Sequence, residues 1–449
     1  KAHGILLQFG GQTAINLALP LADNLTYLSS LGLHLIMEGT SPDAVDEASD
    51  RERFVAFAAR NGLRMPRGLT ATTPDEVRQA AHEIGYPVLI RPSYVLGGRG
   101  MEILSNNKQL EAYMEEAYLA PDRPLLIDEY LENATELDVD AVCDGDSVLI
   151  GAIMEHLEEA GIHSGDSTCF IPPQNVPAHV LAEVEDWTRR IGIELGIKGC
   201  FNIQYAIRDE VLHVLEVNPR GSRTFPFVAK APGVPLARIA ARLALGEKLS
   251  ELNVPEPQTE AVCVKAPVFP FIKLRGLDPA PGPEMKSTGE VMGSHARPAA
   301  AYLKARLATE LPVPTEGGVY ITVKDADKLA IIDEARRLQD LGFTLYATRG
   351  TAHVLRDVGG LDVQTCYRIA ERRTPDALDL MRQGKIHLVI NTPRLTGGAV
   401  LDGNMMRRLA VELIIPFVTT MAGAHMEVEA IYEAMKGMPE PRLLEIGSL

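Results

Sequence analysis

The sequence FNIQYAIRDEVLHVLEVNPRGSR, residues 201–223, contains two apolar runs on either side of a polar pair. The runs are Phe201–Ile207 and Val211–Val217, and the pair is Asp209–Glu210. β-Branched and aromatic residues favour strands, whereas the polar pair favours a turn. The pattern therefore predicts a β-hairpin.

One face of this hairpin carries oxygen ligands. Side chains alternate along a strand, so Glu216 and Asn218 point to one face, and Gln204 on the partner strand can face the same way. Arg220 and Arg223 follow directly. Mg²⁺ takes few protein oxygens and completes its octahedron with phosphate and water, which suits these ligands beside guanidinium donors. The hairpin predicts a site for a divalent cation and a polyanion, and a solvated hairpin face is the alternative.

The composition is that of an ordinary globular protein. A chain of 449 residues has room for roughly two to four domains. Asp and Glu outnumber Lys and Arg by 60 to 44, so nucleic acid and anionic membranes are not expected partners. The five cysteines show no CxxC spacing, and no apolar run approaches the ~20 residues of a membrane span. We expect a cytoplasmic protein with reduced thiols and no signal peptide, and the missing initiator Met indicates a processed or truncated chain.

Upstream segments suggest a nucleotide site. A strand at Gly4–Phe9 and a helix through Ala22 predict a βα unit of a parallel sheet. Tyr86–Leu104 reads as two strands around a glycine-rich turn that contains Gly97 and Gly98. Glycine backbone N–H groups can approach phosphate because no Cβ stands in the way. A plain hairpin tip is the alternative.

The middle of the chain adds acidic residues and a histidine. Glu136–Cys143 (ELDVDAVC) alternates strictly, which puts acidic residues 136, 138 and 140 on one strand face. Either that face is solvated, or one of its carboxylates holds a ribose. His163 follows a turn at Gly161 and is either a surface residue or a nucleotide contact. Residues 251–312 are rich in proline, so we expect a connecting region there rather than a core.

From Val319 onward, strands and helices alternate, which predicts a separate small α/β domain with a parallel sheet. Thr348–Thr351 (TRGT) lies just past a predicted strand end, where ligands bind in open α/β sheets. Its hydroxyl groups and the backbone amides at the start of the following helix can donate hydrogen bonds to an anion. The alternative is that the threonines only cap the helix.

Together these pieces resemble a known family. The phrases RPSYVLGGRGMEI, IMEHLEEAGIHSGDS, FNIQYAI, LEVNPRGSRTFPFVAKAPGVPLARIAAR and GPEMKSTGEVMG are similar to the C-terminal half of carbamoyl phosphate synthetase large subunits. The resemblance is looser over residues 20–38, which look like an insertion or a divergent loop. It implies a multidomain α/β and α+β protein. The parts are a partial pre-ATP-grasp lobe (1–50), an ATP-grasp domain (51–250), a connecting region (251–312) and a methylglyoxal-synthase-like domain with a parallel sheet (313–449).

The resemblance implies ATP-dependent phosphorylation of carbamate to carbamoyl phosphate, a ligase step in pyrimidine and arginine biosynthesis. The cofactors it implies are ATP and Mg²⁺ or Mn²⁺, with two ions expected and K⁺ a further candidate. Arg51 and Arg91 resemble the arginines that grip the triphosphate, beside Gly97 and Gly98. Further residues match the positions that contact the nucleotide in this family. These are Glu129 and Leu131 for the adenine, Glu136 for the ribose, and Gly161, Ile162, His163 and Ser164 for the loop that closes on the nucleotide. The positions of the family's metal ligands are occupied by Gln204, Glu216 and Asn218. The positions near the transferred phosphoryl group are occupied by Asn218, Arg220 and Arg223.

The last domain is similar to domains that bind nucleotide monophosphates such as UMP or IMP. The matching contacts are Lys328, Thr348, Thr351, Arg368 (usually a lysine) and Asn391, and Pro393 stands where some relatives have a threonine. In some relatives a second effector site, for ornithine, falls at Glu158, Asp166, Glu290 and Thr419. The partners implied are a glutaminase small subunit and an N-terminal synthetase half, and we expect an oligomer.

Two other interpretations are open. One is a regulatory or inactive paralogue that binds nucleotide without catalysis, and the intact hairpin set from Gln204 to Arg223 argues against it. The other is a different ATP-grasp ligase, such as a biotin carboxylase relative. The STGEVMG segment and the regulatory tail argue against that one.

Overall fold

The computed structural model describes residues 4–32, 35–92, 100–116, 124–270, 278–393 and 398–437. Its centre is a seven-stranded antiparallel sheet in the spatial order β11-β10-β7-β8-β9-β12-β13. The strands are β7 Thr135–Asp144, β8 Val148–Glu159, β9 Cys169–Ile171, β10 Lys198–Arg208, β11 Val211–Asn218, β12 Val262–Val268 and β13 Gly289–His295.

The predicted hairpin is β10–β11. Asp209 and Glu210 both have positive φ, 52° and 60°. A two-residue turn of this kind matches the twist of paired strands, and it fixes their register. From the turn, the register pairs Arg208 with Val211 and Tyr205 with Val214. A β-bulge between Gln204 and Tyr205 then shifts the register by one residue, so Gln204 lies opposite Glu216 and Asn202 opposite Asn218.

The two faces of the sheet differ. One face packs against helix α7 (Ala178–Glu194) and α4 (Arg51–Arg60) through a large apolar cluster that includes Val139, Phe201 and Trp187. The other face packs at one end against α8 (Phe225–Lys230) and α9 (Leu236–Ala244), where Val142 and Cys200 are buried. Further along that second face, the side chains become polar, and there the candidate site lies.

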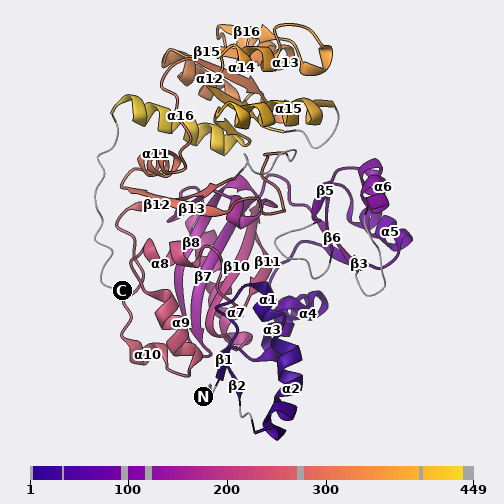
Figure 1. The fold of residues 1–449 in the computed structure, drawn as a ribbon, viewed down its shortest axis with the longest axis vertical. Helices are drawn as coiled ribbons and strands as arrows, with labels where there is room; N and C mark the ends of the chain where they lie inside the picture. The colour runs from indigo at the N-terminus through magenta and orange to yellow at the C-terminus, as the bar shows by residue number, and fades with distance from the viewer. Residues whose placement is uncertain are drawn as a thin grey trace.

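Three smaller units surround the sheet (Figure 1). A four-stranded antiparallel sheet has the order β3-β6-β4-β5 and is covered by two helices. Its elements are β3 Gly68–Ala71, α5 Pro74–Ile84, β4 Val88–Pro92, β5 Glu102–Leu104, α6 Asn107–Glu116 and β6 Leu125–Glu129. The N-terminal lobe pairs β1 (Gly4–Leu6) in parallel with β2 (Ile36–Glu38), with α1 (Gln12–Ile15) and α2 (Ala18–Ser30) between them. Helix α3 (Pro42–Ser49) follows.

The C-terminal domain is a five-stranded parallel sheet in the order β16-β15-β14-β17-β18, as predicted. Its strands are β14 Gly318–Thr322, β15 Thr344–Thr348, β16 Val363–Cys366, β17 Leu388–Asn391 and β18 Phe417–Val418. Its helices are α12 Ile331–Asp340, α13 Arg349–Asp357, α14 Ala377–Arg382, α15 Gly398–Glu412 and α16 Met421–Met435.

Two expectations need correction. Much of residues 20–38 is not a divergent loop, because helix α2 continues to Ser30. Residues 251–312 are more than a connection, because β12 and β13 extend the central sheet and α11 (Pro298–Ala308) is mostly buried between β13 and α16. The proline content led to the wrong prediction, because Pro267 lies inside strand β12 and Pro298 begins helix α11.

All five cysteines are buried and free. Among the described residues, no helix combines the length and apolar character needed to cross a membrane.

Candidate active site

The polar face is built on paired strands. Asp138 lies opposite Gln204 and Glu136 opposite Ala206, so the acidic side chains of β7 share a face with Gln204 and Glu216. Glu136 is 3% exposed, and Asp138 is completely buried. The alternative of a solvated face is therefore wrong for β7. Gln204 and Glu216, toward the sheet edge, are partly exposed and accessible to a ligand.

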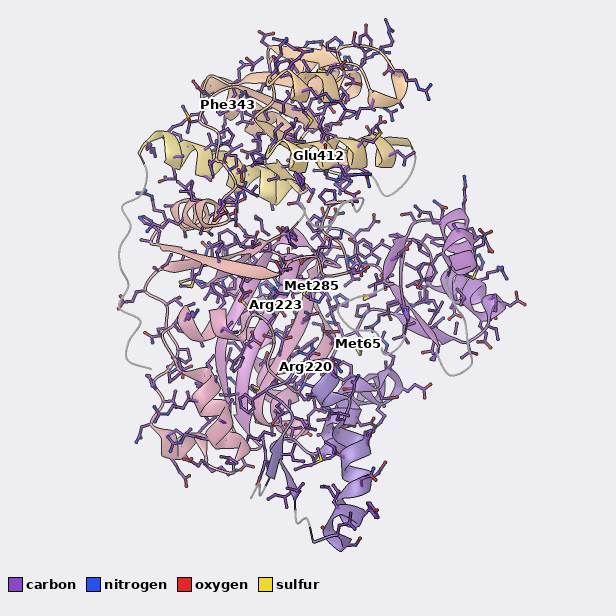
Figure 2. The ribbon with its side chains drawn as sticks, in the orientation of Figure 1. Met65, Arg220, Arg223, Met285, Phe343 and Glu412 are labelled. Atoms are coloured by element: carbon purple, nitrogen blue, oxygen red, sulfur yellow. The ribbon has the colours of Figure 1, made fainter. Side chains whose placement is uncertain are left out.

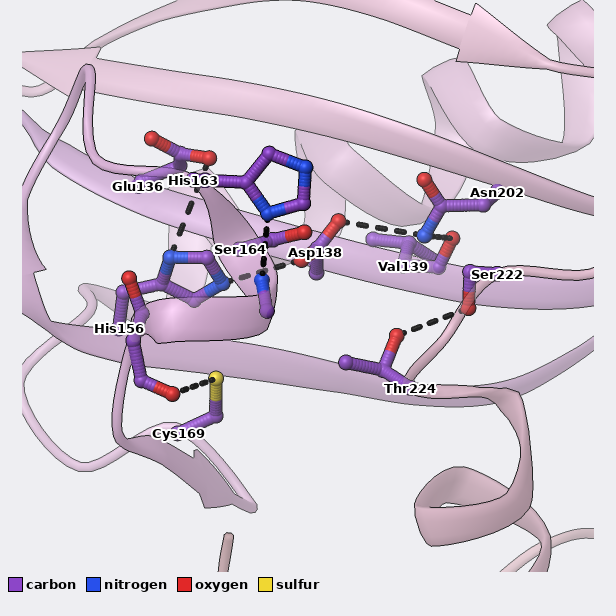
Figure 3. Close-up of polar contacts among 12 residues, drawn as sticks. Glu136, Asp138, Val139, His156, His163, Ser164, Cys169, Asn202, Ser222 and Thr224 are labelled. Carbon is purple, nitrogen blue, oxygen red and sulfur yellow. Dashed lines mark hydrogen bonds and ion pairs between the residues drawn. The ribbon is translucent and has the colours of Figure 1, made fainter. Parts of the chain in front are cut away.

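His156 neutralises part of this buried charge (Figure 3). Its Nε2 lies 3.1 Å from Asp138 Oδ2, and its Nδ1 lies 3.9 Å from Glu136 Oε1. Burial alone would lower the pKa of His156, but Cys169 and the two carboxylates raise it well above its ordinary value. Burial alone would raise the pKa of Asp138, but His156 and Asn202 hold it below its ordinary value. Burial raises the pKa of Glu136 to about 7, so this carboxyl titrates near neutral pH.

Asp140 anchors the loop after β11. Its Oδ2 accepts hydrogen bonds from Ser222 Oγ (2.8 Å) and Thr224 Oγ1 (2.7 Å), and its Oδ1 accepts one from Asn202 Nδ2 (3.1 Å). Burial and the nearby Asp138 raise its pKa to about 7. This contact fixes the segment that carries Arg220 and Arg223.

Arg220 is oriented by the hairpin and by the N-terminal lobe. Asn218 Nδ2 donates to Glu216 Oε1 (2.8 Å), and Arg220 Nη2 donates to Asn218 Oδ1 (3.1 Å). Arg220 Nε donates to Gln12 Oε1 at 3.1 Å, which ties the N-terminal lobe to the hairpin. The structure thus brings together three of the predicted residues, Glu216, Asn218 and Arg220, in one hydrogen-bonded chain.

Arg223 points elsewhere. Its Nη1 donates to Met285 Sδ (3.0 Å) and to the Ser287 carbonyl (3.3 Å), and Figure 2 shows Arg223 beside Met285 and apart from Arg220. The STGEVMG segment begins at Ser287, so Arg223 joins it to the hairpin.

Arg51 and Arg91 converge on one carboxylate that the sequence reading missed. Arg51 Nη2 donates to Asp128 Oδ1 (2.5 Å), and Arg91 Nε donates to Asp128 Oδ2 (3.1 Å). All three side chains are largely buried. Asp128 leaves the other guanidinium nitrogens of Arg91 available to a polyanion. Gly97 and Gly98, predicted to lie beside these arginines, fall outside the described residues.

The remaining nucleotide candidates lie where the small sheet meets the central sheet. Glu129, at the end of β6, accepts a hydrogen bond from Arg208 Nη1 (3.1 Å), and Leu131 is buried with Ala134 and Ala160. The Gly161 amide donates to Glu136 Oε2 at 3.2 Å. The loop continues through Ile162 to His163 and Ser164, where His163 Nδ1 accepts from the Gly165 amide at 3.0 Å. Burial lowers the pKa of His163, which keeps the ring neutral.

The C-terminal domain contains a cavity of about 310 Å³ at the carboxyl ends of its parallel strands. All five candidate contacts line it: Lys328, Thr348, Thr351, Arg368 and Asn391. Pro393 lines it as well. Thr348 precedes α13 but its side chain makes no capping hydrogen bond, so the capping alternative is wrong for Thr348. Four of the lining side chains are cationic, Lys324, Lys328, Arg349 and Arg368, and Thr351 lies in the first turn of α13, which suits an anionic ligand.

Comparisons with known proteins identify the family. Residues 50–252 match the family described as "Carbamoyl-phosphate synthase L chain, ATP binding domain", and residues 330–419 match the MGS-like domain. The carbamoyl phosphate synthase large chain, C-terminal section, of Methanocaldococcus jannaschii is 48% identical over 447 residues, which is 96% of this chain and 70% of that protein. The chain belongs to the carbamoyl phosphate synthase large chain family.

The comparisons also show the fold and how much of each relative this chain matches. The large chain from Methanothrix thermoacetophila is 49% identical over 97% of this chain, and the matched part is 40% of that protein. N5-carboxyaminoimidazole synthase from Aspergillus clavatus has a similar fold, with a TM-score of 0.51 and 15% identity over 64% of this chain and 79% of that one. The fold is therefore an ATP-grasp fold followed by an MGS-like domain. The family match decides against a biotin carboxylase relative.

Two of the four residues of the predicted second effector site, Glu158 and Glu290, lie near the buried Lys265. Both Asp166 oxygens accept amide hydrogens, from Ser287 and Lys286, each at 2.8 Å. Glu158 accepts from the Thr168 amide at 2.6 Å, and burial raises its pKa to about 7. Glu290 keeps one buried oxygen, Oε2, without a partner among the described residues. Thr419 follows β18 directly.

Proposed function

We propose that this chain phosphorylates carbamate with ATP and Mg²⁺, giving carbamoyl phosphate and ADP, as the C-terminal half of a synthetase. In this step a carbamate oxygen bonds to the γ-phosphorus, and the bond between that phosphorus and the β–γ bridging oxygen breaks as ADP leaves. The observation that carries the proposal is the connected set Glu216, Asn218 and Arg220, with Gln204 opposite Glu216. Phosphoryl transfer requires positioning and charge neutralisation more than covalent catalysis, and this set offers both.

The oxygen donors of the hairpin suit Mg²⁺. Gln204 forms no side-chain hydrogen bond within the described part of the chain, so its amide oxygen is available beside the Glu216 carboxylate. Asn218 offers a third oxygen, which now accepts from Arg220. Among the described residues no three His, Cys, Asp or Glu side chains cluster as a metal site, which fits an ion that relies on phosphate oxygens. Bound there, Mg²⁺ would neutralise phosphate charge during transfer.

Other side chains would bind and orient the nucleotide. Arg51 and Arg91, held by Asp128, would grip the phosphates, as charge-assisted bidentate contacts do well. Glu136 would accept from the ribose hydroxyls, and Glu129 and Leu131 would lie at the adenine. The loop Gly161–Ser164 would cover the phosphates and exclude water, which protects a substrate that decomposes in water. Arg220 would stabilise charge on the transferred group.

The proposal extends to partners and effectors. Carbamate would come from the N-terminal synthetase half, with ammonia from a glutaminase small subunit, in pyrimidine and arginine biosynthesis. The C-terminal cavity would bind UMP or IMP, and the unpartnered Glu290 oxygen supports a cationic second effector such as ornithine. Several expectations stay predictions. They are Mn²⁺ in place of Mg²⁺, a bound K⁺, oligomerisation, a cytoplasmic location and the domain limits at residues 50, 250 and 312.

The partial back-reaction tests the proposal. The purified chain is incubated with MgADP and carbamoyl phosphate, and ATP formation is followed with acetyl phosphate as the control donor. We expect ATP from carbamoyl phosphate. A folded chain that binds ADP but makes no ATP from carbamoyl phosphate would support the paralogue without catalysis instead.

A further inference from the structure

A buried arginine joins the C-terminal cavity to the segment before STGEVMG. Arg407, on α15, is 2% exposed. Its Nη1 donates to Asn391 Oδ1 (2.5 Å), and Asn391 lines the cavity. Its Nε and Nη2 donate to the two carboxylate oxygens of Asp278, at 2.9 and 2.5 Å. A bidentate arginine–carboxylate pair of this kind holds both partners in a fixed geometry.

Both ends of the Asn391 carboxamide are hydrogen-bonded within the protein. Its Oδ1 accepts from Arg407, and its Nδ2 donates to the Thr322 carbonyl at 3.1 Å. Each end keeps one further hydrogen-bonding position, so a ligand in the cavity that bonds to the carboxamide shares Asn391 with Arg407 and changes the strength or direction of the bond between them. Whether a ligand occupies the cavity therefore affects the position of Arg407.

Asp278 begins a short folded segment. Its Oδ1 accepts from the Ala280 amide at 3.0 Å, and Lys286 Nζ donates to the carbonyls of Asp278 and Ala280 at 3.0 and 2.5 Å. Burial alone would raise the pKa of Asp278, but Arg407 and Lys286 hold it below its ordinary value. The carboxylate thus stays ionised and paired with Arg407.

The same segment holds the loop of the candidate active site. The Gly282 carbonyl accepts from the His163 amide at 2.9 Å, and Ser287 Oγ donates to the Gly165 carbonyl at 2.9 Å. The amides of Lys286 and Ser287 donate to Asp166, and Met285 contacts Arg223. One continuous set of hydrogen bonds therefore runs from Asn391 through Arg407 and the segment 278–287 to the loop.

A glycine makes room for this contact. A Cβ on Gly403, in the middle of α15, would lie 2.8 Å from Arg407 Nη1 and 3.3 Å from Asn391 Oδ1. Glycine inside a helix is less favourable than alanine. Here the absence of a side chain lets Arg407 reach Asn391.

We propose that Asp278 and Arg407 are positioning residues that couple nucleotide binding in the C-terminal cavity to the geometry of the loop Gly161–Ser164. The inference rests on the proposed function for the two sites that it connects. Coupling of this kind is reciprocal, so MgADP in the active site would change effector affinity by the same factor.

The experiment compares wild type with Asp278→Asn and Gly403→Ala, which perturb the pair from either end. The matched control is Arg297→Gln, which removes another ion pair between residues 251–312 and the C-terminal domain, Arg297–Glu433, away from the cavity. The first readout is the KM for ADP in the back-reaction, with and without saturating UMP or IMP. The second is amide hydrogen exchange at His163, Lys286 and Ser287 in the free chain.

We expect Asp278→Asn to bind UMP or IMP within about threefold of wild type but to reduce the effector-induced change in KM by about fivefold or more. Both variants should raise exchange at the three amides about tenfold, and Arg297→Gln should leave it unchanged. The double variant should lose no more coupling than either single one. Unchanged exchange in Asp278→Asn and Gly403→Ala overturns the proposal.

The two readouts separate this proposal from the proposed function. If wild type makes no ATP, or if neither nucleotide changes the KM, the assigned activity or effector fails. Amide exchange would still decide whether Asp278 and Arg407 hold the loop.

Discussion

Replacing Asp128 with asparagine probes how the phosphate-binding arginines are held. The Asp128 side chain is 10% exposed, and it lies between Arg51 and Arg91, which are 16% and 23% exposed. Burial lowers the pKa of Arg51, and the charge of Asp128 counters this effect. Asparagine keeps the shape but removes the charge and one acceptor oxygen. One arginine therefore loses its partner, while the two guanidinium groups still repel each other.

The magnitude follows from the bond that is lost. A hydrogen bond to a charged group contributes about 1.5–3 kcal/mol, so the loss of one should cost about 2 kcal/mol. If that energy is used to position the phosphates, kcat/KM for ADP in the back-reaction falls about 30-fold. Gly68→Ala should lower it as well, because a Cβ there would collide with Asp128 and Arg51.

The assay is ATP formation from MgADP and carbamoyl phosphate, with urea unfolding measured in parallel. Asp75→Asn is the control, since Asp75 also pairs with an arginine, Arg78, but is 97% exposed. We expect the control to retain wild-type activity. A kcat/KM within threefold of wild type for a folded Asp128→Asn variant would refute the idea that Asp128 positions these arginines.

Three further predictions concern other parts of the chain. Asp140→Asn should lower the rate of ATP formation about tenfold or more with little change in ADP affinity, because Ser222 and Thr224 lose the anchor of the Arg220 loop; an unchanged rate would contradict this. Thr351→Val should weaken UMP or IMP binding at the C-terminal cavity, measured by calorimetry, while leaving basal ATP formation intact, and unaltered binding would remove Thr351 from that site. The free energy of unfolding should fall as pH rises from 5 to 8, because burial raises the pKa values of Glu136, Asp140 and Glu158 to about 7 and the folded state keeps protons that the unfolded chain releases above their ordinary pKa values. Glu136→Gln should remove about 3 kcal/mol of that decline, and an equally steep pH profile in this variant would show that Glu136 is not its source.

The hairpin was predictable because its information is local. A two-residue turn pairs Arg208 with Val211, and alternation places Glu216 and Asn218 on one face of the strand. The β-bulge that sets Gln204 opposite Glu216 was not predictable, because the turn register alone would pair Gln204 with Leu215. The same alternation predicted the acidic face of β7. Whether that face is solvated or buried was not predictable, since it depends on His156 from the next strand and on the loop that covers it.

The residue pairs that could not be predicted from the sequence are contacts between distant segments. Asp128 meets Arg51 across 77 residues, and Asp278 meets Arg407 across 129. No spacing or periodicity encodes such pairs, because they form only when separate units dock. Arg223 illustrates the same limit, since its proximity to Arg220 in sequence suggested one shared site, whereas its side chain contacts Met285.

The measurement that tests the central claim most directly compares Glu216→Gln with Glu210→Gln in the same hairpin. Glu216 faces Gln204 in the proposed metal site, whereas Glu210 is 67% exposed in the turn. With saturating Mg²⁺, we expect Glu216→Gln to bind ADP but to make ATP from carbamoyl phosphate about a hundredfold more slowly, and Glu210→Gln to match wild type. Wild-type turnover in a folded Glu216→Gln variant would contradict the assignment of this hairpin as the phosphoryl-transfer site.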